Sequence, residues 1–188
     1  MATVMKFQVD DFGVTPDIAC LRKTISMQEF DATVVDINVN VSEHGVVDFI
    51  FDDDYSANDG ATLVAVVAGH QLVVAKHRKI GAIDRRTEEL IGMGFIYGGV
   101  ACSLSIPSQS KMTAAHQIKD HPYFAYPVEW NSIDDSSTYS IASAADMDMF
   151  YLTAIGTIRA RLDSGTSLKN LVRAAALVAE VEGIVDPR

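Results

Sequence analysis

VDINVNVSEHGVVDFIF, at residues 35–51, is the stretch that decides the fold of this chain. Apolar and polar residues alternate over 35–41 and again over 47–51, and a period of two is typical of a strand with one buried face. Between the two runs lies Glu43-His44-Gly45, where the glycine can take the positive φ that a tight turn needs. The stretch therefore predicts a β-hairpin.

A helix is expected on each side of this hairpin. Thr15-Pro16 predicts the start of the first, with threonine as the N-cap and proline at the first helical position, and this helix should run to about Met27. Ser56–Asp59 resembles a capping box at the start of the second, which is expected to end at Gly69. Residues 1–75 are therefore predicted to form a small α+β module with the order helix, hairpin, helix.

Residues 83–188 are predicted to form a second α+β module. Its first part shows glycine, proline and period-two signals for these elements: a helix over 84–93 closed by Gly94, a hairpin turning at Gly98-Gly99, a helix over 107–118, and extended segments over 126–130 and 138–141. Residues 71–83 join the two modules, and their pattern is compatible with a strand, a helix extension or a linker.

The second module is expected to end in an antiparallel αα-hairpin. Ser143–Asp146 again fits a capping box, and Gly165 is expected to end the helix that follows. The apolar residues of this helix recur mostly at spacings of three and four, which predicts one apolar face: Met147, Phe150, Tyr151, Ala154, Ile155, Ile158 and Leu162. A second helix, capped by Thr166 or Ser167 and ended by Gly183, completes the αα-hairpin. The predicted fold class is therefore α+β.

The charge and composition exclude several kinds of partner. The formal net charge is -10, whereas nucleic-acid binders draw much of their affinity from Lys and Arg, and an anionic membrane surface would repel the chain. The longest apolar stretch, within Leu63–Ala75, is too short to span a bilayer, and the first residues do not resemble a signal peptide. Cys20 and Cys102 lie outside any C-x-x-C pattern, which indicates two buried thiols. We expect no nucleic-acid partner and no membrane.

Three groups of residues invite a chemical interpretation, and each has a simpler one. Asp52-Asp53-Asp54 suggests calcium, but position twelve counted from Asp54 is Ala65 instead of the glutamate that an EF-hand needs. His116 and His121 are five residues apart, whereas metal ligands on one helical face prefer three or four. Asp134-Asp135 could act as an acid and base pair, but paired acids in a turn are usually solvated. We predict no catalytic, cofactor-binding or metal-binding residues.

Aromatic residues of the second module are the candidates for a surface that contacts other proteins. Tyr123, Phe124, Tyr126 and Trp130 gather around two prolines, and Trp and Tyr dominate the energetics of protein interfaces. Core packing is the simpler interpretation of the same residues. The predicted interface residues, taken around this cluster and the αα-hairpin, are Tyr123, Phe124, Tyr126, Trp130, Phe150 and Tyr151.

Several short motifs of the second module occur in a fixed order. They are Leu90-Ile-Gly-Met-Gly-Phe95, Tyr97-Gly-Gly, Ser103-Leu-Ser105, Tyr126-Pro-Val-Glu-Trp130, Ala145-Asp146-Met and Leu162-Asp-Ser-Gly-Thr-Ser-Leu-Lys169. This series resembles a phage and prophage domain family of unknown function that is often encoded near tail-fibre genes. The likeness covers roughly residues 83–181 and depends on the order of the motifs. It implies a role in a virion or in its assembly, and the family brings no catalytic residues with it.

The resemblance and the composition together lead to one functional expectation. We expect a structural, non-enzymatic protein of a tailed bacteriophage, made in the host cytoplasm and located in the virion, which docks on symmetric neighbours in the tail, baseplate or fibre-attachment region. Its partners would be other virion proteins and further copies of the chain, in a homo-oligomer such as a trimer or hexamer. The alternatives are a head decoration or vertex (cement) protein and a tail-fibre assembly chaperone.

Overall fold

The structure is a computed structural model that describes residues 3–12, 16–26, 28, 34–40, 46–51 and 56–188. Helices and small antiparallel strand pairs make up the fold, which is α+β as predicted. The chain divides into two compact units. Unit 1 consists of Met1–Lys79 and Val172–Val185, and unit 2 of Ile80–Leu171 and Asp186–Arg188. The predicted division into modules at 1–75 and 83–188 stays a prediction.

A three-stranded antiparallel sheet forms the β-part of unit 1. The predicted hairpin is confirmed, because β2 (Val34–Asn40) pairs with β3 (Val46–Phe51); its turn lies outside the described residues. The sequence interpretation missed β1 (Thr3–Gln8), which pairs with the other edge of β3 and gives the strand order β1-β3-β2. In the sequence, Met5 and Phe7 alternate with Lys6 and Gln8, and this short period-two pattern was the signal that could have predicted β1.

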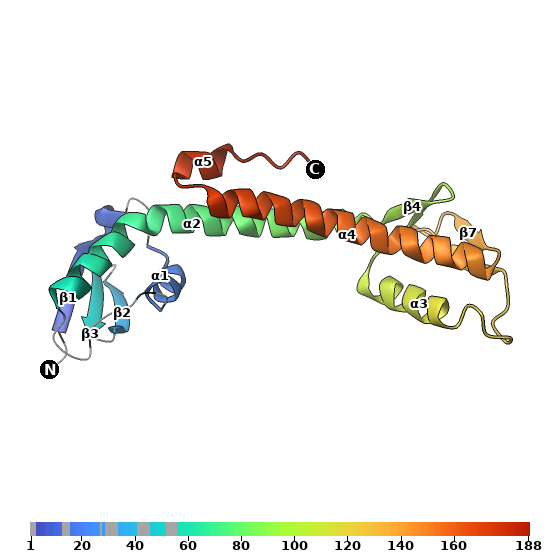
Figure 1. Cartoon of the computed structure of the whole chain (residues 1–188), viewed down its shortest axis with the longest axis horizontal. Helices are drawn as coiled ribbons and strands as arrows, with labels where there is room; N and C mark the ends of the chain where they lie inside the picture. The colour runs from blue at the N-terminus through green and yellow to red at the C-terminus, as the bar shows by residue number, and fades with distance from the viewer. Residues whose placement is uncertain (1–2, 13–15, 27, 29–33, 41–45, 52–55) are drawn as a thin grey trace. The chain divides into compact units, whose positions relative to one another are not determined.

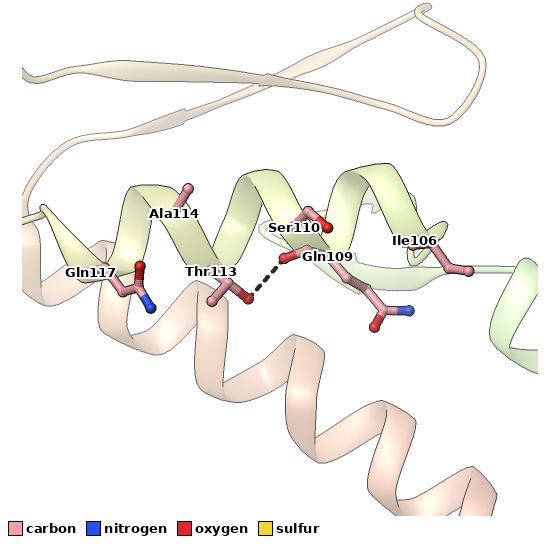
Figure 2. A pocket seen from close by; sticks show the side chains of 6 residues that line it. All are labelled: Ile106, Gln109, Ser110, Thr113, Ala114 and Gln117. Atoms are coloured by element: carbon pink, nitrogen blue, oxygen red, sulfur yellow. Dashed lines mark hydrogen bonds between the residues drawn. The ribbon is translucent and has the colours of Figure 1, made fainter.

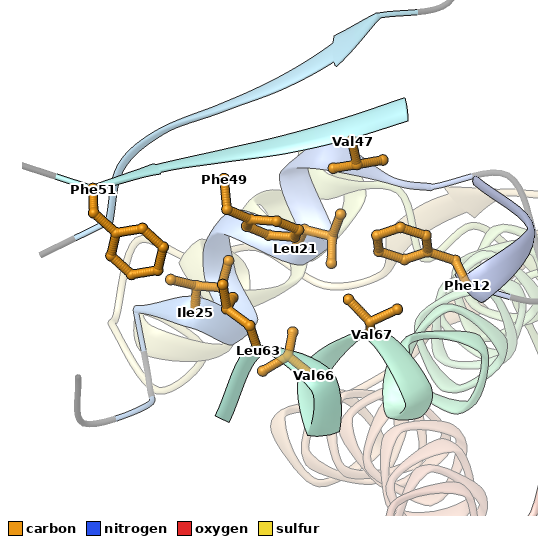
Figure 3. Packing of buried hydrophobic residues seen from close by; sticks show 9 residues of the cluster. All are labelled: Phe12, Leu21, Ile25, Val47, Phe49, Phe51, Leu63, Val66 and Val67. Carbon is orange, nitrogen blue, oxygen red and sulfur yellow. The ribbon is translucent and has the colours of Figure 1, made fainter. Parts of the chain in front are cut away.

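The core of unit 1 gathers on one face of β3, as Figure 3 shows. Val47, Phe49 and Phe51 are fully buried, as their alternation predicted. They pack with residues from the 3-10 helix η1 (Val9–Phe12), from α1 (Ile18–Ile25) and from the first turns of α2 (Ala57–Gly92): Phe12, Leu21, Ile25, Leu63, Val66 and Val67.

The first helix begins later than predicted. The N-cap of α1 is Asp17, whose carboxylate accepts a hydrogen bond from the backbone N–H of Cys20 at 2.9 Å. Pro16 therefore precedes the helix, and Thr15, the predicted cap, lies outside the described residues. Aspartate is among the best N-cap residues, so the local chemistry favours this start as well as the predicted one.

The second helix is much longer than predicted. Ser56 and Asp59 form the predicted capping box, in which each side chain accepts a hydrogen bond from the other residue's backbone N–H. However, α2 continues through Gly69, so the predicted end of this helix is wrong. The joining segment 71–83 and the helix predicted over 84–93 are both parts of α2. An interior glycine costs about 1 kcal/mol, which is less than the burial of a single residue such as Val67 or Val74 contributes. As predicted, the helix ends before Gly94. This glycine has a φ of 73°.

The middle part of unit 2 follows the prediction closely. A hairpin of β4 (Phe95–Tyr97) and β5 (Val100–Cys102) turns at Gly98-Gly99, and both glycines have the positive φ of a type I′ turn. The remaining elements are α3 (Ile106–Gln117), capped by Ser105, and an antiparallel pair of β6 (Val128–Asn131) and β7 (Thr138–Ile141).

The predicted αα-hairpin at the end of the chain is wrong. Residues Ala144–Ala174 form one helix, α4, which continues through Gly165, and only the short α5 (Val178–Gly183) follows. A Cβ atom at Gly165 would lie 2.6 Å from Thr87 Oγ1, so this glycine permits a close approach of α4 to α2 within unit 2. An ion pair of 2.7 Å between Lys169 and Asp84 joins the same two helices, which Figure 1 shows side by side.

Among the described residues, no helix combines the length and the apolar character that crossing a membrane requires.

Candidate functional site

Helix α4 carries apolar side chains on two faces of unit 2. One face supplies Met147, Phe150 and Ala154 to the core, where they pack with residues of the strands and of α3. A second face exposes large apolar side chains, which we call the outer stripe: Met149, Leu152, Ile155 and Leu162. Ile155 and Leu162 were predicted to share one apolar face with Met147, Phe150 and Ala154, but they are exposed whereas those three are buried. A helix that is apolar on two faces normally has both of them covered.

Hydrogen bonds hold the first turn of α4 in place. The carboxylate of Asp146 accepts hydrogen bonds from the hydroxyls of Tyr97 and Tyr139 and from the backbone N–H of Ala142, while Ser143 Oγ accepts from the N–H of Asp146. Partial burial acts to raise the pKa of Asp146, but these hydrogen bonds outweigh it and hold the pKa below its usual value. The stripe therefore lies on a helix whose start is tied to β4 and β7.

The outer stripe forms a broad band on the exposed side of α4. Met149, Leu152 and Ile155 follow one another at intervals of three, and Leu162 stands seven residues after Ile155. At 3.6 residues per turn, these four side chains spread over about 140° of the helix surface, which is broader than the narrow seam of a coiled coil. Arg159 lies within the same stretch and forms an exposed ion pair with Asp163 at 3.7 Å.

Two of the predicted interface residues lie in the core. Trp130 is 4% exposed and Phe150 is fully buried, with their ring centroids 5.0 Å apart. The structure therefore supports core packing for this pair, which was the simpler interpretation of the cluster.

The other four predicted interface residues reach the surface to different degrees. Tyr123 is 92% exposed, while Phe124, Tyr126 and Tyr151 are half-buried. The ring of Tyr151 stacks on the imidazole of His116, with the two ring centroids 4.1 Å apart. That these residues contact a partner stays a prediction.

The sequence interpretation missed Met149 and Leu152. Both are apolar residues outside the apolar face that the helical spacing predicted. The segment has more apolar residues than one helical face can hold, and this excess could have indicated a second apolar face.

The paired acids Asp134 and Asp135 stabilise the turn between β6 and β7. The carboxylate of Asp134 accepts hydrogen bonds from the side chains of Ser132 and Ser136, which lower its pKa to about 2. Asp135 adopts a φ of 54° and accepts a hydrogen bond from the amide of Asn131. Each carboxylate therefore accepts its hydrogen bonds from residues in or beside the turn.

The two histidines considered as metal ligands have separate partners. His116 Nε2 lies 2.7 Å from a carboxylate oxygen of Asp148, which joins α3 to α4. His121 Nδ1 accepts a hydrogen bond from the backbone N–H of Tyr123. Within the described part of the chain, no group of three His, Cys, Asp or Glu side chains is arranged to hold a metal ion. The calcium candidate Asp52-Asp53-Asp54 lies outside the described residues.

Hollows lie on the described surface of unit 2, and two of them are lined by residues of or near α3 and β6. One, of about 420 Å³, follows α3 and is shown in Figure 2; its lining is Ile106, Gln109, Ser110, Thr113, Ala114 and Gln117. The other, of about 490 Å³, lies beside β6, and there the Lys111 ammonium sits 4.5 Å from the centre of the Trp130 ring. Polar side chains dominate both linings, whereas sites for small molecules are mostly apolar.

No protein-family model matches the chain, and no curated protein and no solved structure shows significant similarity to it.

Proposed function

We propose that this chain is a structural virion protein of a tailed bacteriophage, without enzymatic activity, that docks on symmetric neighbours in the tail, baseplate or fibre-attachment region. The observation that carries the proposal is the outer stripe of α4, because four large apolar side chains are exposed within about four turns of one helix, and exposed apolar surface of this kind favours contact with other proteins. The ordered motif series supplies the virion context.

A second copy of the chain is the partner that the outer stripe suits best. Because the stripe is an exposed apolar band on a helix, the same band on another copy would match it in chemistry. Arg159 and Asp163 carry opposite charges at one end of the stripe, so a pair of copies can also match in charge. Fully burying an exposed leucine side chain contributes about 1.5–3 kcal/mol, so each of the half-exposed stripe residues, on both copies, would add part of this amount to association. We propose on this basis that the chain forms a homo-oligomer, for which a trimer or hexamer is the expectation from the sequence.

Leu152→Glu is expected to weaken self-association at least tenfold, because it places a charge where Leu152, 60% exposed, would become buried in the oligomer. Sedimentation over a series of protein concentrations measures the change.

The matched control is Leu171→Glu, which makes the same substitution at a leucine of the same helix that is 58% exposed and lies about 28 Å further along. This control should keep the oligomeric state of the unchanged chain. A monomeric unchanged chain, or equal oligomers in both variants, would contradict the assignment of the stripe.

Quantitative mass spectrometry of gradient-purified phage particles tests the function itself. Presence at low copy number supports a place in the tail, baseplate or fibre attachment. An abundance close to that of the major capsid protein would instead favour a head decoration protein, and absence from the particle would leave the tail-fibre assembly chaperone.

A further inference from the structure

His70 is a buried imidazole of unit 1 that the proposed function does not use. It lies on α2, is 1% exposed, and its Nε2 atom accepts a hydrogen bond of 3.1 Å from the backbone N–H of Asp17. Asp17 is the N-cap of α1. Because a neutral imidazole carries a single N–H, an accepting Nε2 places that proton on Nδ1.

The surroundings of His70 favour its neutral form. Nδ1 is buried and has no hydrogen-bond partner among the described residues. The ring of Phe12 packs against the imidazole edge-to-face, with the two ring centroids 5.4 Å apart. Burial lowers the pKa of His70, and the nearby carboxylate of Asp17, which raises it, does not offset this effect. The carboxylate of Asp11, in η1, is exposed and accepts a hydrogen bond from the backbone N–H of Gln8, so its hydrogen bond is made with the backbone and not with His70.

We propose that His70 is a pH-sensitive latch, which holds the start of α1 while it is neutral and releases it when it is protonated. Protonated Nε2 becomes a donor, so it cannot accept the N–H of Asp17, and two donors then face each other. The new positive charge would also lie beside the N-terminus of α1, which already carries a partial positive charge. In this closed state the backbone N–H of Asp17 and both ring N–H groups of His70 would lack acceptors, which is strongly unfavourable.

Release of α1 would open the core of unit 1. The helix contributes the buried side chains Cys20, Leu21 and Ile25. Figure 3 shows Leu21 and Ile25 facing the apolar residues of β3 and α2. Such a local opening exposes apolar surface without requiring the whole chain to unfold.

The direction of the pH dependence follows from the lowered pKa. Below the ordinary value of 6.5, the released state binds a proton that the closed state resists, so acid favours release. The stabilisation is complete above pH 6.5 and is lost as the pH falls from there towards the lower pKa of the closed state. Between pH 7.5 and 5.5, the population of the open state should rise by up to about tenfold.

Hydrogen exchange of the α1 segment, resolved by mass spectrometry and corrected for the intrinsic pH dependence of exchange, measures this opening. In the unchanged chain, the protection of α1 relative to α4 should fall by up to about tenfold between pH 7.5 and 5.5. His70→Gln should abolish this dependence, because the glutamine oxygen can accept the N–H of Asp17 but cannot be protonated. The matched control is His77→Gln, at an exposed histidine of the same helix, which should keep the dependence of the unchanged chain.

A second measurement, on the unchanged chain, does not depend on the folding of the variant. Nitrogen chemical shifts of His70 should report a proton on Nδ1 at neutral pH and a titration below pH 6.5. A ring that titrates at or above 6.5, or an α1 protection that is constant over this pH range, would overturn the proposal.

Discussion

Trp130→Ala is expected to lower the free energy of unfolding of unit 2 by about 3–5 kcal/mol, the usual cost of deleting a buried aromatic side chain. Trp130 is 4% exposed and lies in the cluster formed by Phe95, Met147, Phe150 and their neighbours. The substitution removes its ring contact with Phe150 and leaves a cavity. Scanning calorimetry measures the loss.

Tyr123→Ala is the control for this experiment. Tyr123 belongs to the same predicted interface set but is 92% exposed, so its removal should change the stability by no more than about 0.5 kcal/mol. If Trp130→Ala left the stability unchanged and instead prevented assembly, Trp130 would face a partner and its buried placement would be wrong.

Gly94→Ala should destabilise unit 2 by a similar amount, about 3–5 kcal/mol, through two separate effects. Gly94 has a φ of 73°, a conformation that a Cβ atom makes costly. In addition, the new Cβ atom would lie 2.1 Å from the carbonyl oxygen of Cys102, so the backbone of β5 would have to move. Denaturant unfolding followed by the fluorescence of Trp130, the single tryptophan of the chain, reports this change.

Gly92→Ala provides a control two residues away. Gly92 is the last residue of α2, and a Cβ atom added there would meet no atom within 4 Å. We expect a neutral effect or a stabilisation of up to about 1 kcal/mol, since alanine favours a helix. Equal losses in the two variants would show that the close approach of Gly94 to Cys102 does not exist.

The candidate site was only partly predictable from the sequence. The aromatic cluster around Trp130 was recognised, but whether it faced the core or a partner was left open, because an aromatic side chain suits both places. The outer stripe was missed because helical spacing was used to assign one apolar face to α4. Leu152 lies outside that face, and Ile155 was placed on it although it is exposed.

Local chemistry in the sequence determined the starts of α2 and α4, the β2–β3 and β4–β5 hairpins, and the end of α2 before Gly94. In each case the partners lie a few residues apart, as in the capping box of Ser56 and Asp59. Only the tertiary structure decided that the helices continue through Gly69 and Gly165, since the cost of a helical glycine is small compared with the packing of residues on either side of it. It also decided which apolar residues are buried, because burial depends on neighbours that are distant in the sequence, as Thr87 is from Gly165.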